Sequence, residues 1–134
     1  MDIWELTPWT EFDMVIRLLM AAVLGGLLGY ERERAVKPAG LRTHLLVCVG
    51  AALFAIASIH GFGFMSDPSR VAAGIVIGIG FLGAGTILRD ERGIIGLTTA
   101  ATIWTVAAVG LATGVGLYLL AIVTTVIVFI ALRL

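Results

Sequence analysis

Residues 93–132 read GIIGLTTAATIWTVAAVGLATGVGLYLLAIVTTVIVFIAL, and this stretch decides the fold. It contains no acidic or basic residue and no histidine. At ~1.5 Å per residue, one helix of this length would be about twice as long as a ~30 Å hydrocarbon core is thick. We therefore expect two helices, and the glycines clustered in residues 112–116 predict the break between them.

The composition of the whole chain supports a membrane protein. The chain has 134 residues, of which 60% are hydrophobic and 13% charged, whereas soluble domains carry about 25% charged residues. The formal net charge of +0 offers no overall field for nucleic acid. The single cysteine, Cys48, excludes an intrachain disulfide. Because no Lys or Arg precedes the first apolar run, as it would in a cleaved signal, we interpret that run as a retained span.

Three further apolar runs lie upstream of residue 93. The first contains Asp13 and Arg17 near its start, where snorkelling toward the membrane surface lowers the cost of a charge. The sequence therefore predicts an all-α membrane protein, a bundle of five transmembrane helices that forms a single domain over residues 1–134. The predicted spans are 12–30, 43–60, 70–88, 97–113 and 116–132.

The positions of Lys and Arg predict the orientation of these spans. Basic residues are concentrated in the loops after the first and third spans and at the end of the chain, and such residues favour the cytoplasmic side. We therefore expect the N-terminus outside and the C-terminus in the cytoplasm. The basic residues on the predicted inner side are Arg32, Arg34, Lys37, Arg42, Arg89, Arg92 and Arg133, against Arg70 alone on the outer side.

Residues 78–85, GIGFLGAG, have the glycine spacing of a dinucleotide-binding turn. That motif needs a preceding strand and an acidic residue about 20 positions later, but these glycines lie inside a predicted span and residues 98–106 contain no acid. We expect no cofactor, and we interpret the glycines as helix-packing residues. Whether such rows meet within one bundle or across a homodimer is left open. The predicted packing glycines are Gly25, Gly29, Gly74, Gly78, Gly83, Gly110 and Gly114.

Polar residues at the membrane edges are the candidates for function. Arg17 is either a functional intramembrane charge or a structural residue paired with Asp13 one turn away. Two predicted helix N-termini face the basic loops and offer a surface for an anion, while contact with lipid headgroups explains the same charges. The functional polar candidates are Asp13, Arg17, Glu31, Arg32, Glu33, Arg42, Thr43, His44, Asp67, Arg70, Arg89, Thr98 and Thr99.

Metal binding and catalysis have weak support in the sequence. Asp67 and Glu31 are the weak candidates for a metal ligand, and the sequence favours Asp67 instead as a cap for the helix that follows Pro68. His44 and Cys48 lie one turn apart, but two ligands without a third do not make a site. Because no nucleophile with its base, P-loop or paired catalytic carboxylates is present, we expect no enzyme.

Four ordered stretches of the chain match one known family. They are RLLMAAVLGGLLGYERER from Arg17, KPAGLRTHLLVCVGAALF from Lys37, DPSRVAAGIVIGIGFLGAGTILR from Asp67 and GLTTAATIWTVAAVGLATGVGLYLLA from Gly96. Together they resemble the MgtC/SapB family of bacterial inner-membrane proteins. The resemblance implies a five-span membrane domain and an association with magnesium homeostasis, stress survival and virulence, in some members through the ATP synthase. Many members carry a cytoplasmic domain after the fifth span, and we expect none here after Leu134.

Two functions remain open from the sequence. The first is a regulatory membrane protein that contacts a second copy of itself and a larger membrane complex such as the ATP synthase through its helices. The second is a small transporter or channel for magnesium or another ion. The acidic residues lie at the membrane edges rather than in mid-span, which favours the first function, because magnesium prefers carboxylate and water oxygens.

Overall fold

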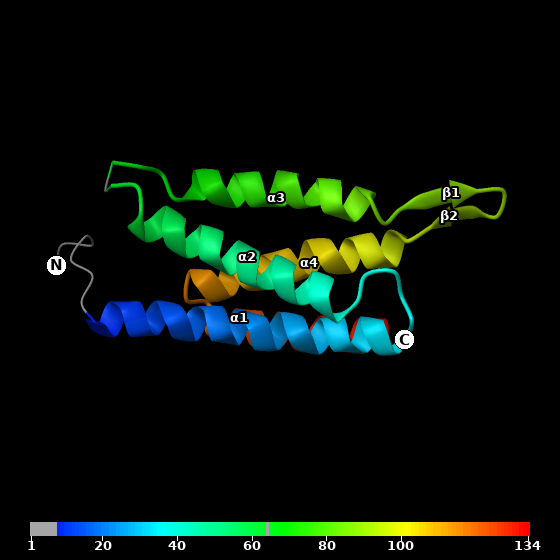
Figure 1. Ribbon diagram of the computed structural model, residues 1–134, viewed down its shortest axis with the longest axis horizontal. Helices are drawn as coiled ribbons and strands as arrows, with labels where there is room; N and C mark the ends of the chain where they lie inside the picture. The colour runs from blue at the N-terminus through cyan, green and yellow to red at the C-terminus, as the bar shows by residue number, and fades with distance from the viewer. Residues whose placement is uncertain (1–7, 64) are drawn as a thin grey trace.

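The computed structural model describes residues 8–63 and 65–134. These residues form five helices that lie along one long axis, with a small β-hairpin at one end (Figure 1). The prediction of a helical protein with five helices is confirmed. The elements are α1 (Pro8–Arg34), α2 (Leu41–His60), α3 (Ser69–Ala84), β1 (Leu88–Asp90), β2 (Gly93–Ile95), α4 (Leu97–Gly114) and α5 (Tyr118–Leu132).

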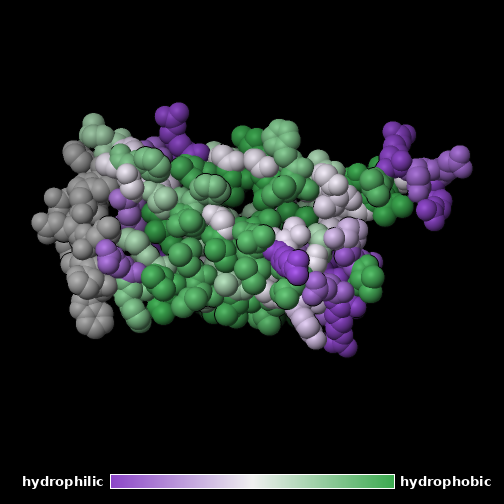
Figure 2. Space-filling model, in the orientation of Figure 1, coloured by the Kyte–Doolittle hydropathy of each residue, from purple (hydrophilic) through white to green (hydrophobic). Residues whose placement is uncertain are grey.

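Three of the helices, α1, α2 and α4, are long and apolar enough to cross a membrane, whereas α3 and α5 are shorter apolar helices. Figure 2 shows hydrophobic residues over the middle of one face of the molecule, with hydrophilic residues gathered mainly at the end that carries the hairpin. A broad apolar band between polar ends is the surface expected of a protein that sits in a bilayer.

Helix α3 ends earlier than the sequence predicted. The predicted span 70–88 merges a helix that stops at Ala84 with a strand that begins at Leu88. The helix ends where glycine and β-branched residues follow one another, at Gly83, Gly85, Thr86 and Ile87, all of which have lower helix propensity than Ala or Leu. The boundary of the predicted third span is therefore corrected to residues 69–84.

The hairpin that follows α3 was not predicted. Strands β1 and β2 pair antiparallel, with Leu88 opposite Ile95 and Asp90 opposite Gly93. The carboxylate of Asp90 accepts the backbone N–H of Arg92 at 2.7 Å, and Gly93 has a φ of 112° that favours glycine. Both strands are exposed along their whole length.

The backbones of α1, α2 and α4 approach closely where glycines meet α2. A Cβ atom at Gly29 would lie 2.8 Å from the Cα of Leu41, and one at Gly110 would overlap the carbonyl oxygen of Cys48. Glycine is therefore required for the observed helix separations at both positions. The central core comprises Ala21, Leu24, Leu28, Cys48, Ala52, Val106, Val109 and Ala121.

The bundle has two ends that are distinguished below. The hairpin end holds the last turns of α1 and α5, the first turns of α2 and α4, and the hairpin itself, and the C-terminus lies there (Figure 1). The far end holds the beginnings of α1 and α3, the end of α2, and the turn between α4 and α5.

Candidate functional site: polar clusters at the two ends of the bundle

At the far end, Arg17 on α1 holds three elements together. Its guanidinium forms an ion pair with Asp13 at 2.6 Å and donates a hydrogen bond to the carbonyl oxygen of Gly114 at 2.9 Å. It also lies 5.8 Å from the ring centroid of Tyr118, whose hydroxyl donates to Asp13 at 3.3 Å. This far-end cluster joins α1 to the turn between α4 and α5.

The position of Arg17 has a clear electrostatic cause. The last carbonyl groups of a helix lack partners within the helix and carry a partial negative charge. Gly114 is the last residue of α4, so the Arg17 guanidinium satisfies one of these carbonyls and complements the helix dipole. Of the two interpretations that the sequence left open, these contacts support a paired structural arginine.

At the hairpin end, two charged residues of α1 are almost completely buried. Arg32 is 4% exposed and Glu31 is 8% exposed. Arg32 donates a hydrogen bond to the hydroxyl of Thr99 in the first turn of α4 at 2.9 Å. Glu31 forms an ion pair with Arg133, just beyond α5, at 3.3 Å. This hairpin-end cluster therefore joins α1 to both α4 and α5.

His44 on α2 is completely buried beside this cluster. Its Nδ1 lies 2.9 Å from the carbonyl oxygen of Gly40, and because a carbonyl only accepts, Nδ1 carries the proton. Within the described part of the chain, His44 Nε2 and Arg32 Nε are buried without a hydrogen-bond partner. The sequence placed His44, Arg32 and Thr99 on one side of the membrane, and the structure brings Arg32 and Thr99 into contact.

The metal candidates are occupied by other contacts. Glu31 is paired with Arg133, and Asp67 accepts the backbone N–H of Ser69 at 2.9 Å and its hydroxyl at 2.7 Å. These hydrogen bonds from Ser69, helped by the positive charge of Arg70, hold the pKa of Asp67 below its usual value. In residues 8–63 and 65–134, no three His, Cys, Asp or Glu side chains are grouped as a metal site would require.

Asp67 supports the start of α3, because Ser69 is the first residue of that helix. The remaining polar candidates are exposed and scattered over the two ends of the molecule. Thr43 and Thr98 lie in the first turns of α2 and α4, and Arg89 lies on the hairpin strand β1. The exposed candidates are Glu33, Arg42, Thr43, Arg70, Arg89 and Thr98.

The predicted packing glycines differ in what they contact. Gly25 and Gly29 lie against α2, and Gly110 and Gly114 lie against α2 from the other side, while Gly83 makes ordinary contact with Ala100 of α4. A Cβ atom at Gly74 or Gly78 would meet nothing within 4 Å. These two glycines do not contact another helix of the described chain, and they line an apolar groove between α2 and α3.

Two participants in the end clusters were missed by the sequence analysis as site residues, Tyr118 and Arg133. Arg133 is the counter-ion of Glu31, and Tyr118 is the ring beside Arg17. The predicted orientation places Glu31 and Arg133 on the same side of the membrane, but nothing in the sequence shows that α1 and α5 are neighbours.

The fold and its two polar ends indicate a small helical membrane protein. The chain belongs to the MgtC family, whose family model matches residues 18–134. The resemblance found in the sequence is thereby confirmed.

Relatives of known name share close to half of their aligned residues with this chain. "Putative magnesium transporter YhiD" of Escherichia coli strain K12 is 46% identical over 90% of this chain and 60% of its own length. "Protein MgtC" of Salmonella typhimurium strain LT2 is 44% identical over 90% of this chain and 51% of its own length. "Uncharacterized protein slr0014" of Synechocystis is 46% identical over 92% of this chain and 51% of its own length. The chain thus spans about half to three fifths of the curated relatives it matches. No solved structure matches it.

Proposed function

We propose that this chain is a non-catalytic regulatory protein of the bacterial inner membrane that serves magnesium homeostasis and stress survival or virulence. It acts through helix contacts with a second copy of itself and with a larger membrane complex such as the ATP synthase. In this proposal all five helices cross the membrane, with the N-terminus outside and the C-terminus in the cytoplasm. The resemblance to the MgtC/SapB family and the printed name of the YhiD relative support the link to magnesium.

The observation that carries the regulatory proposal is the separation of the two polar clusters. Arg17 and Arg32 are about 22 Å apart along α1, at ~1.5 Å per residue. Between them, Ala21, Leu24 and Leu28 are buried in the apolar core. A magnesium ion keeps several water molecules and prefers carboxylate ligands, so this closely packed apolar segment is a poor route for it.

A transporter of magnesium or another ion is the second candidate. The observation in its favour is the printed name of the YhiD relative, which shares 46% identity with this chain. Its route would use the carboxylates at the two ends, of which Asp13 and Glu31 are paired with arginines. Transport therefore requires these ion pairs to open and the apolar core between them to separate.

Flux into liposomes separates the two candidates. The full chain is purified and reconstituted in vesicles that contain a magnesium-sensitive dye, and a magnesium gradient is imposed. We expect no uptake above that of empty vesicles. Uptake that rises with protein density and falls in a Glu31→Gln variant would replace the regulatory proposal with the transporter.

Cysteine crosslinking in native membranes tests the contact part of the proposal. The buried Cys48 is first replaced by alanine, and one cysteine is then placed at Ile77 of α3 or Leu119 of α5, which are 72% and 73% exposed. A cysteine at Ala121, which is 0% exposed, is the control. We expect a crosslinked dimer or a crosslinked larger complex from an exposed position and none from Ala121. A protein that restores growth in low magnesium while giving no crosslink from either exposed position contradicts the proposal.

A further inference from the structure

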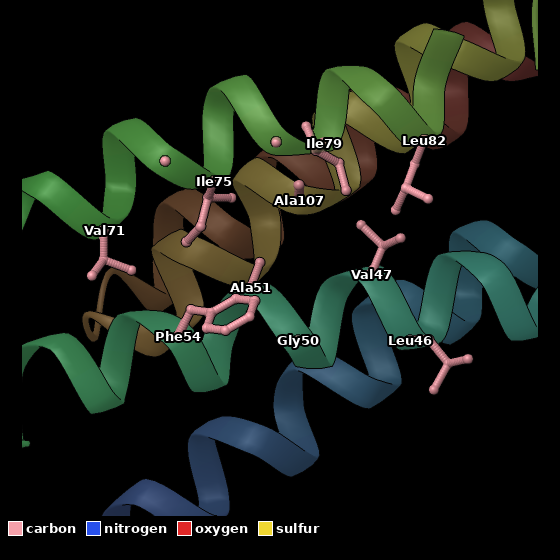
Figure 3. Close-up of a pocket in the computed structure, with 12 residues that line it drawn as sticks. Leu46, Val47, Gly50, Ala51, Phe54, Val71, Ile75, Ile79, Leu82 and Ala107 are labelled. Atoms are coloured by element: carbon pink, nitrogen blue, oxygen red, sulfur yellow. The ribbon is translucent and has the colours of Figure 1, made fainter. Parts of the chain in front are cut away.

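An apolar groove of about 610 Å³ separates α3 from α2. Val71, Ile75, Ile79 and Leu82 project from α3 toward α2, and Phe54 of α2 lies on the opposite wall of the groove (Figure 3). The groove is open because glycines line it, and a Cβ atom at Gly50, Gly74 or Gly78 would meet nothing within 4 Å. The close helix contacts at Gly29 and Gly110 have no counterpart here.

The length of the groove corresponds to one leaflet of a bilayer. From Val71 to Leu82 the groove follows α3 for about 17 Å, at ~1.5 Å per residue, and half of a ~30 Å hydrocarbon core is about 15 Å. An apolar groove that faces hydrocarbon does not stay empty, because its walls would lose dispersion contacts that a hydrocarbon chain supplies.

A smaller pocket, lined by apolar residues such as Phe62 and Met65 together with a few polar ones, adjoins the groove at the far end of the bundle. Val71 lines both cavities, and the second one, of about 400 Å³, is also lined by Ser66, Asp67 and Arg70. The Asp67 carboxylate already accepts two hydrogen bonds from Ser69. Arg70 is exposed and, within residues 8–63 and 65–134, forms no salt bridge. Its guanidinium is therefore available to a phosphate, for which its donors are well arranged.

We propose that these two adjoining cavities bind one membrane phospholipid. One acyl chain occupies the groove between α2 and α3, and the phosphate of the headgroup binds Arg70 at the mouth. The apolar groove, its one-leaflet length and the unpaired arginine at its open end fit the two chemically different parts of a single lipid. This site is independent of whether the protein regulates a partner or transports an ion.

A transmembrane helix from a second copy is the other occupant to consider. A helix is about 10 Å across with its side chains, whereas a single hydrocarbon chain is much narrower and can follow the glycine-lined gap between α2 and α3. The phospholipid is therefore the occupant that we propose, and the second copy is an outcome of the test.

Native mass spectrometry of the full chain, released from membranes in mild detergent, measures the bound phospholipid directly. Gly78→Leu fills the groove, while Gly80→Leu is its matched control. Both glycines are exposed on α3 with nothing within 4 Å of a Cβ, but only Gly78 lines the groove. We expect one phospholipid on most wild-type and Gly80→Leu molecules and an at least fivefold lower occupancy for Gly78→Leu.

The headgroup is tested by Arg70→Gln with added phosphatidylglycerol. We expect the variant to need several times more lipid for the same occupancy, and the difference from wild type to shrink at high salt. Equal lipid occupancy in Gly78→Leu and Gly80→Leu would overturn the proposal. A Gly78→Leu variant that keeps its lipid but loses a dimer peak would assign the groove to a second copy instead.

Discussion

The contact between α4 and α2 at Gly110 allows a sharp test of the fold. In Gly110→Ala the new Cβ atom would overlap the carbonyl oxygen of Cys48 and lie 3.0 Å from the Cβ of Ala51. The main obstacle is backbone rather than the end of a flexible side chain, so the clash is relieved only by moving α4 away from α2. We predict that this single methyl group destabilises the protein.

The size of the effect follows from two opposing contributions to the free energy of unfolding. Alanine is favoured over glycine in a helix by ~0.5–1 kcal/mol. Overpacking typically costs ~1–3 kcal/mol, and the upper half of this range applies because two backbones must separate. The net loss at Gly110 is therefore about 1–2.5 kcal/mol. Gly80→Ala on α3 is the control, because nothing lies within 4 Å of its Cβ position and it does not line the groove, and it should gain up to about 1 kcal/mol.

Thermal unfolding of the full chain in detergent, followed by circular dichroism at fixed detergent and lipid concentration, measures this difference. We expect the midpoint of Gly110→Ala to fall by several degrees and that of Gly80→Ala to stay or rise. Equal midpoints for the two variants would refute the inference that α2 and α4 are in backbone contact at this glycine.

Three further predictions concern charged residues, all measured by the same thermal assay. Arg17→Met lowers the free energy of unfolding by about 1–3 kcal/mol, because it removes a charged hydrogen bond to a helix terminus. Arg32→Met is neutral or stabilising, because it replaces a buried charge with an apolar side chain. Equal losses of stability in the two variants would contradict this difference. Arg133→Ala destabilises the protein because it leaves Glu31, which is 8% exposed, without its partner. Adding Glu31→Gln recovers most of this loss. If the losses of the two single variants simply add in the double variant, the two residues are not coupled as an ion pair. Because the pKa of Asp67 is lowered in the folded state, its carboxylate stabilises the protein at pH values above its ordinary pKa of about 3.9. This contribution is lost as the pH falls through the lower folded pKa. The stability of Asp67→Asn should therefore depend less on pH below about pH 4 than that of the wild type.

The sequence predicts the helices well because each of them corresponds to a long apolar run. An apolar run near 20 residues can satisfy its backbone in a bilayer only as a helix or a closed barrel, and the glycines of residues 112–116 mark the turn before Tyr118, where α5 begins. The hairpin was missed because its strands have three residues each. A run that short shows no alternating pattern, and only three residues separate β1 from the end of the apolar helix α3.

For the hairpin-end cluster, the sequence predicted only which polar residues lie on the inner side of the membrane, and not which of them are in contact. Arg32 and Thr99 were both expected among the inner polar groups, but their contact depends on the packing of α1 against α4. For the glycines too, spacing in the sequence does not show which of them contact another helix. Gly25 and Gly29 repeat every four residues as Gly74 and Gly78 do, yet the first pair contacts α2 and the second pair borders the open groove. Glycine permits close approach of a helix but does not require that a helix be present.

Arg17, which is partly exposed, and the buried Arg32 differ because of where they meet α4. Arg17 lies at the C-terminal end of α4, where the partial charge of the helix is negative, and the carbonyl oxygen of Gly114 accepts its hydrogen bond. Arg32 lies against the N-terminal turn of the same helix, where the partial charge is positive, and its hydrogen bond goes to the neutral hydroxyl of Thr99. The C-terminal end of α1, where Arg32 lies in the last turn, and its neighbour Glu31 offset that repulsion. Because Glu31 is also paired with Arg133, Arg32 is the less well compensated of the two charges. The dipole of α4 therefore stabilises the charge at the far end of the bundle and opposes the charge at the hairpin end, which is the physical reason why Arg17→Met should destabilise the protein and Arg32→Met should not.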